Sequence, residues 1–376
     1  MTAGFGAYLH IPFCAARCDY CAFATWTDRG ELVDRYMEGL RASVAAAAPD
    51  MPPVTSVFVG GGTPSLVPPQ SLVDAVAELP LAEGVEITVE CNPDTVTDEL
   101  LATYRDGGVT RISLGVQSMV PEVLRSLGRT HSVGSVERAV AAVRSSGIGT
   151  FNLDVIYGGA GETVGQWERT LDAVLALEPP HVSAYALTVE PGTPLAADVA
   201  RHPDDDDQAV KYERAGRRLE DAGLGWYEIS NWARPGHECR HNLLTWAQGD
   251  YVGFGCAAHS HRRGRRWWNV RTPDRWLDLL ERGAAVEAGS EVLDAPTRAS
   301  EALELAIRTR TGVPAWALDP VADPELEPLV TSVADPAGGA RWVLTTAGRL
   351  LANEVALRLR PERGAHDAAT AGSTNT

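Results

Sequence analysis

The chain has 376 residues, of which 44% are hydrophobic and 22% charged, and its formal net charge is −17 at pH 7. A chain of this length can bury a large core and is expected to form more than one domain. The acidic balance argues against general nucleic-acid binding, which needs a positive surface. Neither a bilayer-spanning apolar run nor a signal peptide is visible, so we expect a cytoplasmic protein with no integral membrane span.

The first apolar run, 7–11, leads directly into three closely spaced cysteines. Cys14, Cys18 and Cys21 have the spacing C-x3-C-x2-C, in the run His10-Ile-Pro-Phe-Cys-Ala-Ala-Arg-Cys-Asp-Tyr-Cys-Ala-Phe23. Three thiolates on a loop can hold three irons of a cubane cluster and leave the fourth iron open to a ligand. The alternatives are three buried free thiols, or a zinc site with His10 as its fourth ligand. We favour the cluster, because His10 belongs to the preceding predicted strand.

Over the first half of the chain, apolar β-branched runs alternate with longer amphipathic stretches. We predict strands at 7–11, 54–60, 86–91, 111–116, 151–157 and 181–188, and helices at 31–48, 70–79, 97–105, 135–146 and 164–177. Such alternation is typical of parallel strands joined by helical crossovers. Six units predict an α/β fold with an open, partial (β/α)6 barrel. The two further strands that a closed eight-unit barrel needs are not evident.

Polar residues end several of these strands, where barrels of this kind place their sites. Gly60-Gly-Gly-Thr-Pro64 follows the second strand, and its glycines allow close approach of the backbone to a ligand. Glu90, Gln117 and Asp154 end the next three strands. A single carboxylate at such a position is usually a cap or a surface residue, but three polar residues at equivalent positions indicate a common site. Arg129 is either a two-pronged partner for a carboxylate or a solvated charge.

Beyond residue 200 the pattern changes. An acidic run at 203–207 predicts a solvated turn before a helix at 208–222, with short strands at 225–229 and 251–254 and a helix at 297–308. The run 342–351 resembles the strand and turn of a winged-helix-like module, and a helix is expected at 352–359. We therefore expect a barrel over 1–200, a connecting segment over 201–292, a C-terminal α+β region with the winged-helix-like module over 293–360, and a disordered tail over 361–376.

Together these motifs resemble the coproporphyrinogen oxidase-like branch of the radical S-adenosylmethionine (SAM) enzymes, over about residues 5–360. The resemblance implies a [4Fe-4S] cluster on the three cysteines, whose open iron chelates the amino and carboxylate groups of SAM. It also implies that the reduced cluster can cleave SAM to a 5′-deoxyadenosyl radical, and that the glycine run lies along the methionine part of SAM. The implied SAM site comprises Tyr8, Phe23, Gly61, Gly62, Thr63, Glu90, Gln117, Arg129, Asp154 and Ala186.

Two sub-branches share these motifs. The oxygen-independent coproporphyrinogen III oxidases carry a fourth cysteine two residues after the third, where this chain has Phe23, and an extension before the motif, where this chain has 13 residues before Cys14. The heme chaperones carry a His-Asn-x-x-Tyr-Trp segment, which His241-Asn-Leu-Leu-Thr-Trp246 resembles, with Thr245 in place of the tyrosine. We expect a heme chaperone, keep the oxidase as the alternative, and leave open whether the chain cleaves SAM.

The resemblance to heme chaperones implies that heme is a third ligand. His241 is the expected heme contact, because imidazole is a usual ligand of heme iron, although a lone histidine is more often packed. Trp232 and Trp246 can pack against a macrocycle or belong to the core, and the arginines at 262–266 are favoured as a solvated loop over partners of the propionates. The expected partners are heme, an electron donor for the cluster, and heme-accepting proteins such as respiratory-chain cytochromes or heme enzymes.

Overall fold

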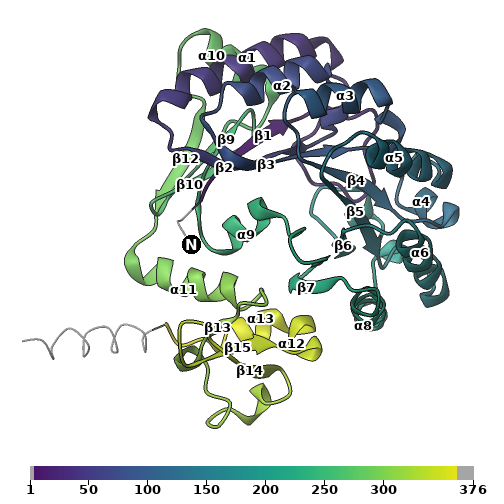
Figure 1. Cartoon of the computed structure of the whole chain (residues 1–376), viewed down its shortest axis with the longest axis vertical. Helices are drawn as coiled ribbons and strands as arrows, with labels where there is room; N and C mark the ends of the chain where they lie inside the picture. Colours follow the sequence, from purple (N-terminus) through teal and green to yellow (C-terminus); the bar gives the residue numbers. More distant parts are fainter. Residues whose placement is uncertain (1–3, 362–376) are drawn as a thin grey trace, which may run out of the picture.

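The computed structural model describes residues 4–361, and most of them belong to one large mixed sheet with helices around it (Figure 1). Twelve strands are hydrogen-bonded in the order β12-β11-β10-β9-β1-β2-β3-β4-β5-β6-β8-β7. The sheet does not close on itself, because β12 and β7 are its two edges. A smaller sheet of three strands forms a second unit near the carboxyl end.

The centre of the large sheet is parallel and follows the chain order. Its strands are β1 (Phe5–Ile11), β2 (Val54–Gly61), β3 (Leu81–Cys91), β4 (Arg111–Gln117), β5 (Thr150–Tyr157) and β6 (His181–Ala186). All six predicted strands are present, and the predicted open, partial (β/α)6 barrel is confirmed. Parallel strands bring their carboxyl ends to one edge, so the motifs that end these strands lie along that edge.

Helices cover the outer, convex face of this sheet (Figure 1). They are α1 (Val33–Ala47), α2 (Pro69–Ala77), α3 (Asp98–Asp106), α4 (Pro121–Ser126), α5 (Val133–Ser145), α6 (Val164–Ala176) and α8 (Asp205–Asp221). The buried residues of α1, which are Tyr36, Met37, Leu40 and Val44, share one face of the helix and pack in the main apolar core. The predicted helices are confirmed. The short α4 and α7 (Pro194–Ala197) were not predicted, because so few residues show no periodicity.

Residues beyond 220 extend the sheet at both ends. On one side β9 (Asp250–Phe254) runs parallel to β1, and β10 (His259–Arg262), β11 (Arg265–Asn269) and β12 (Glu287–Val292) follow as antiparallel strands. On the other side β8 (Asn231–Ala233) and β7 (Gly225–Glu228) continue from β6. The range 201–292, expected as a connecting segment, thus contributes strands β7–β12. Helix α10 (Pro273–Glu281) packs against α1, whereas α9 (Arg240–Trp246) lies on the concave side (Figure 1).

The C-terminal unit has an apolar core of its own. It begins with α11 (Ala295–Ala306) and contains the antiparallel sheet β13 (Val313–Pro314), β15 (Ala340–Leu344) and β14 (Val330–Ala334), followed by α12 (Thr346–Leu350) and α13 (Ala352–Ala356). The stretch 346–350, expected as a turn, is helical because Thr345 caps it by accepting from the Gly348 N–H. The winged-helix-like assignment stays a prediction, and the tail expected at 361–376 lies, except for Pro361, outside the described residues.

None of the helices within residues 4–361 is both long and apolar enough to span a bilayer.

Candidate functional site

The three motif cysteines lie on a loop that leaves the carboxyl end of β1 and returns beside it. The loop is closed at its base, where the Cys14 N–H donates to the Trp26 carbonyl (3.1 Å) and the Trp26 N–H donates to the Pro12 carbonyl (2.7 Å). Within the loop, the Cys21 N–H donates to the Cys18 carbonyl (3.2 Å). All three thiols are free and partly exposed. The sequence therefore holds three sulfur donors on one short loop that solvent can reach.

His10 fastens this loop to β1. Its Nε2 lies 2.9 Å from the Ala24 carbonyl, and its Nδ1 lies 3.0 Å from the Tyr8 hydroxyl. Since a carbonyl only accepts, Nε2–H donates to it and Nδ1 accepts from Tyr8. Burial lowers the pKa of His10, which keeps the ring neutral. Both ring nitrogens are engaged, so the geometry gives no support to His10 as a fourth zinc ligand.

The surroundings of the thiols suit a thiolate-bound cluster. Burial raises the pKa of Cys14 and of Cys21, so these thiols need a metal or a cation to become thiolates. Arg129 supplies positive charge, because its Nη1 donates to Cys18 Sγ (3.3 Å) while its Nη2 donates to the Gly115 carbonyl (3.1 Å). Within the described residues, no three His, Cys, Asp or Glu side chains converge closely enough to hold one metal ion.

Within residues 4–361 Arg129 forms no ion pair with a carboxylate, which was one of its two expected roles. Its buried Nε has no hydrogen-bond partner among residues 4–361. Arg129 nevertheless lies at the cysteine loop rather than in solvent. The guanidinium therefore keeps a donor available beside the motif cysteines.

The glycine run joins the end of β2 to the cysteine loop. Gly62 N–H donates to the Ile11 carbonyl (2.7 Å), and Thr63 N–H donates to the Phe13 carbonyl (2.8 Å). Gly61 has φ +113°, and a Cβ at that position would lie 2.5 Å from the His10 ring. Only glycine fits such a backbone with so close a neighbour. The run therefore brings peptide groups next to the cysteines without side chains in between.

Two buried carboxylates, Glu90 on β3 and Asp154 on β5, line one cavity below this run, with β4 between their strands. Glu90 Oε2 accepts from the Gly61 N–H (3.0 Å), while Asp154 accepts from Ser113 Oγ (2.8 Å) and Asn152 Nδ2 (2.7 Å). Burial, together with the charge of Asp154, raises the pKa of Glu90 to about 7, although the hydrogen bond from the Gly61 N–H lowers it. Burial likewise raises the pKa of Asp154. A cationic ligand between them would relieve this cost of paired negative charge.

Both carboxylates line a mainly polar cavity of about 330 Å³ in the barrel, part of it open to solvent. Most of its lining was not predicted from the sequence. It comes from alternate positions of β3–β6, with Phe58 added from β2. The signal was available, because residues two apart on a strand share a face. Cys239 and Asn242 close the cavity from the side of α9. The strand residues are Phe58, Thr88, Glu90, Arg111, Ser113, Asn152, Asp154, His181, Ser183 and Tyr185.

The remaining predicted SAM residues lie along the same edge. Gln117 ends β4 with φ +62°, an uncommon backbone for a residue other than glycine, and Ala186 ends β6. Thr63 Oγ1 donates to Cys14 Sγ (3.7 Å). Tyr8 stacks on Phe58 from within β1, and the side chain of Phe23 is 66% exposed beside the third cysteine. Nine of the ten residues therefore come from β1–β6 or from the loops that follow β1 and β2, and Arg129 comes from the loop between α4 and α5.

His241 lies elsewhere, at the opposite end of the strands. It is 7% exposed, its Nδ1 lies 3.2 Å from Ser56 Oγ, and its ring packs against Phe58 and Tyr251. Burial lowers its pKa to about 4, so the ring is neutral. Its Nε2 makes no hydrogen bond within the described residues and is the nitrogen available to a metal. The structure does not bring His241 together with the cysteine loop.

The other residues considered for heme have partners of their own. Trp232 is fully buried against Tyr212 and belongs to the core. Arg265 pairs with Glu287 (2.6 Å), and Arg266 pairs with Glu291 (2.9 Å). The basic run thus belongs to the hairpin of β10 and β11, and Arg265 and Arg266 form ion pairs with the neighbouring strand β12.

Comparisons with known proteins agree with this arrangement. Residues 8–174 match the family model of the radical SAM superfamily. The chain is 43% identical over 364 residues to the heme chaperone HemW of Mycobacterium tuberculosis (strain ATCC 25618 / H37Rv), with 93% of each chain covered. It is 35% identical to the heme chaperone HemW of Escherichia coli (strain K12), over 93% of this chain and 96% of the relative.

Among solved structures, the fold matches coproporphyrinogen III oxidase (HemN) from Escherichia coli, which its description calls a radical SAM enzyme. The TM-score is 0.80 at 21% identity, and the match covers 94% of this chain and 89% of that chain. At this identity the likeness concerns the fold.

Proposed function

This chain belongs to the family of the heme chaperone HemW, a branch of the radical SAM superfamily, and on that premise we propose that it binds heme and delivers it to acceptor proteins. The observation that carries the proposal is identity of 35–43% to such chaperones over 93% of the chain. The acceptors we propose are respiratory-chain cytochromes or other heme enzymes, with a separate electron donor for the cluster.

We propose that Cys14, Cys18 and Cys21 hold a [4Fe-4S] cluster and that SAM binds at its open iron. Such a cluster, when bound and reduced, supplies an electron to the sulfonium of SAM. The residues of the chain prepare that site: Arg129 offsets negative charge at Cys18, and the glycine run, whose N–H groups donate to Glu90 and Ile11, holds the end of β2 against the cysteine loop. The sulfonium and ammonium groups of SAM suit the buried carboxylates Glu90 and Asp154, whose negative charge a cation would compensate.

The contact with heme is supported by fewer residues than the SAM site. His241 remains our candidate contact, through Nε2. Because the ring is almost fully buried, heme can reach it only if α9 moves away from β1 and β2. The polar cavity beside α9 does not suit an apolar macrocycle. We therefore propose that α9 opens when heme binds.

The test uses anaerobically reconstituted protein and measures heme binding, heme transfer and porphyrinogen turnover separately. We expect a stable Soret band on heme titration and its decay when an apo-cytochrome is added. Incubation with coproporphyrinogen, dithionite and SAM should yield no protoporphyrinogen. Product formation with no retained heme would instead favour the oxidase.

The matched variants for heme are His241→Ala and His237→Ala, because both histidines come from the same segment. Loss of the Soret band only in the first supports Nε2 of His241 as the contact. Unchanged binding in both removes His241 from the site and leaves the chaperone assignment to the transfer assay.

A further inference from the structure

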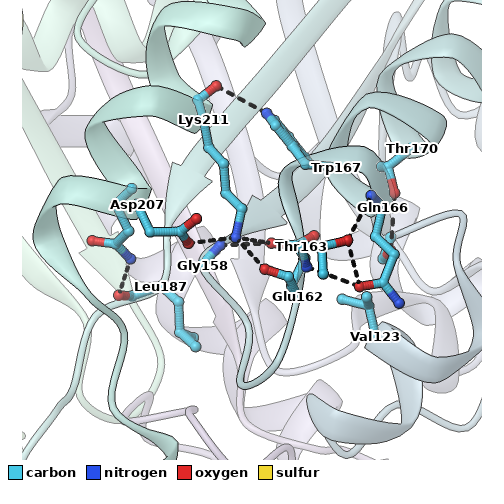
Figure 2. Close-up of polar contacts among 12 residues, drawn as sticks. Val123, Gly158, Glu162, Thr163, Gln166, Trp167, Thr170, Leu187, Asp207 and Lys211 are labelled. Carbon is cyan, nitrogen blue, oxygen red and sulfur yellow. Dashed lines mark hydrogen bonds and ion pairs between the residues drawn. The ribbon is translucent and has the colours of Figure 1, made fainter.

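A fully buried lysine lies outside the site described above, next to the point where the chain leaves the carboxyl end of β5. We call the residues that directly follow β5 and β6, Gly158 and Leu187, the exits of these strands. The side chain of Lys211, on α8, has 0% exposure. Its Nζ donates to the Glu162 carbonyl (2.6 Å) and lies 3.4 Å from Glu162 Oε2 and 2.5 Å from Asp207 Oδ2 (Figure 2). A buried ammonium is costly unless it is paired and hydrogen-bonded. The arrangement therefore fixes the loop that carries Glu162 against α8.

Glu162 links Lys211 to the end of β5 through a second hydrogen bond. Its Oε2 accepts from the Gly158 N–H (2.8 Å), directly after the last residue of the strand (Figure 2). Gly158 has φ +86°, and a Cβ there would collide with the side chain of Gln208. Gly158 belongs to the run Asp154-Val-Ile-Tyr-Gly158, so Lys211 acts within a few residues of the proposed SAM site.

A second side chain on the same face of α8 contacts Leu187, the residue that directly follows β6. Gln208, one turn before Lys211, donates from Nε2 to the Leu187 carbonyl (2.9 Å). The Leu187 N–H in turn donates to the Tyr157 carbonyl (2.9 Å), and Leu187 directly follows Ala186. Two side chains of one helix therefore set where β5 and β6 end.

The distance along the sheet relates these strand ends to the proposed SAM site. Neighbouring strands are about 4.8 Å apart, so β5 lies roughly 14 Å from β2 along the sheet. If the methionine part lies over Gly61 and Gly62 on β2, the ligand extends along the strand ends toward β5 and β6. We propose that Lys211 and Gln208 are positioning residues for the nucleoside end of SAM, acting through Gly158 and Leu187.

The two carboxylates near Lys211 are not equivalent. Glu162 is buried, and its Oε1 has no partner among the described residues, so it depends on Lys211 for compensation. Asp207 is 36% exposed and lies in the first turn of α8, where the helix dipole stabilises negative charge. Within the described residues, Asp207 makes no hydrogen bond or ion pair with the residues that follow β5 and β6. Asp207→Asn is therefore a matched control that removes the other ion pair.

The inference rests on the proposed binding of SAM, and its test separates the two. We would measure iron content and the dissociation constants of SAM and of free methionine for the reconstituted full chain. In Lys211→Met we expect about tenfold weaker SAM binding, equivalent to about 1.4 kcal/mol, with unchanged iron and nearly unchanged methionine binding. In Gln208→Ala we expect the same selective loss, of about threefold. Asp207→Asn should bind SAM within twofold of the unaltered chain.

The double variant Lys211→Met with Glu162→Gln supplies a rescue. A glutamine oxygen can still accept from the Gly158 N–H, and no uncompensated carboxylate remains, so SAM affinity should largely return. If Lys211→Met does not fold, Gln208→Ala decides alone.

Unchanged SAM affinity in folded Lys211→Met or Gln208→Ala overturns the inference, as does equal weakening of SAM and methionine. Failure of the unaltered, cluster-loaded chain to bind SAM would instead contradict the proposed function.

Discussion

Glu90 is the residue of the candidate site whose charge changes near neutral pH, since burial and Asp154 raise its pKa to about 7. A raised carboxyl pKa means that the folded state binds more protons than the unfolded state between the ordinary pKa and about 7. The contribution of Glu90 to folding stability therefore falls as pH rises through that window. Binding of a cationic ligand has the opposite dependence, because it requires the ionised form.

We therefore expect SAM affinity to rise about tenfold between pH 6 and pH 8, in proportion to the ionised fraction of Glu90. Glu90→Gln should bind SAM more weakly at pH 8 and lose most of this pH dependence. Equilibrium dialysis of the reconstituted protein across this range measures both. Glu83→Gln, on the exposed start of β3, is the control. A profile in Glu90→Gln that parallels the unaltered chain would contradict the assignment.

Arg129 permits a second prediction at this scale. Its guanidinium lies 3.3 Å from Cys18 Sγ and so stabilises negative charge at the cysteine loop. Arg129→Met should lower the reduction potential of the cluster, by about 60 mV if the loss corresponds to a tenfold change for one electron. A redox titration followed by electron paramagnetic resonance measures the potential.

The matched control is Arg201→Met, near the same loop. Arg201 pairs with Asp19 (2.8 Å) and donates to the Ser126 carbonyl, so its charge is already compensated by a carboxylate. We expect a much smaller shift of potential in this variant. Equal shifts in the two variants would mean that general loosening of the loop, and not the charge at Cys18, sets the potential.

At the scale of elements, the sequence predicts the parallel centre well because each strand and helix there is long enough to show its periodicity. It does not predict β10 and β11, since His259-Ser-His-Arg262 and Arg265-Arg-Trp-Trp-Asn269 are mainly polar or charged and depend on non-local antiparallel pairing. The seven residues of α9 are likewise too few to show a helical period.

The residues of the candidate site also fall into those that the sequence predicts and those that it does not. The strand-end residues follow from local motifs and from the family resemblance, because parallel strands place their carboxyl ends together. The contacts of Arg129, the pairing of Lys211 with Glu162 and the docking of α9 join residues far apart in sequence. Only the folded chain shows such partners, although the alternating polar residues of β3–β6 were a readable sign of a polar interior.

The first turn of helix α9 is capped by a side chain from β3, and this contact can be tested. Glu86 Oε1, on β3, accepts from the N–H groups of Arg240 (2.7 Å) and His241 (3.3 Å) at the first turn of α9. Glu86→Ala leaves these N–H groups without the carboxylate, at a cost of about 1 kcal/mol. Amide hydrogen exchange at 240–246 should accelerate roughly fivefold. If α9 must open for heme, the same variant should also bind heme faster.

The control for α9 is Glu83→Ala, which lies on the same strand but does not contact the helix among the described residues. Faster exchange in both variants would indicate general destabilisation of β3. Faster exchange with unchanged heme kinetics in Glu86→Ala would contradict the opening of α9 while leaving its capping by Glu86 intact.

At the scale of the whole molecule, the barrel and the C-terminal unit meet where Ile229 packs on the C-terminal core and the Arg310 N–H donates to the Tyr227 carbonyl. A polar and aromatic contact around Arg349 adds to this junction. Arg349, on α12, is 8% exposed and lies 4.7 Å from the Trp226 ring and 5.8 Å from the Tyr212 ring, with Glu220 at 3.7 Å. Tyr212 and Glu220 belong to α8, the helix that also carries Lys211. The C-terminal unit is therefore held against the helix that fastens the exits of β5 and β6.

Arg349→Met should weaken this docking by about 1–2 kcal/mol, the range of a desolvated cation–π contact. The core of the C-terminal unit is separate, so its own fold should persist. Arg341→Met is the matched control, because Arg341 pairs with Asp335 (3.0 Å) inside that unit. Hydrogen exchange should therefore accelerate at α8 and β7 in the first variant, and at β14 and β15 in the second. Acceleration over the whole chain in Arg349→Met would show instead that the two cores unfold as one cooperative unit.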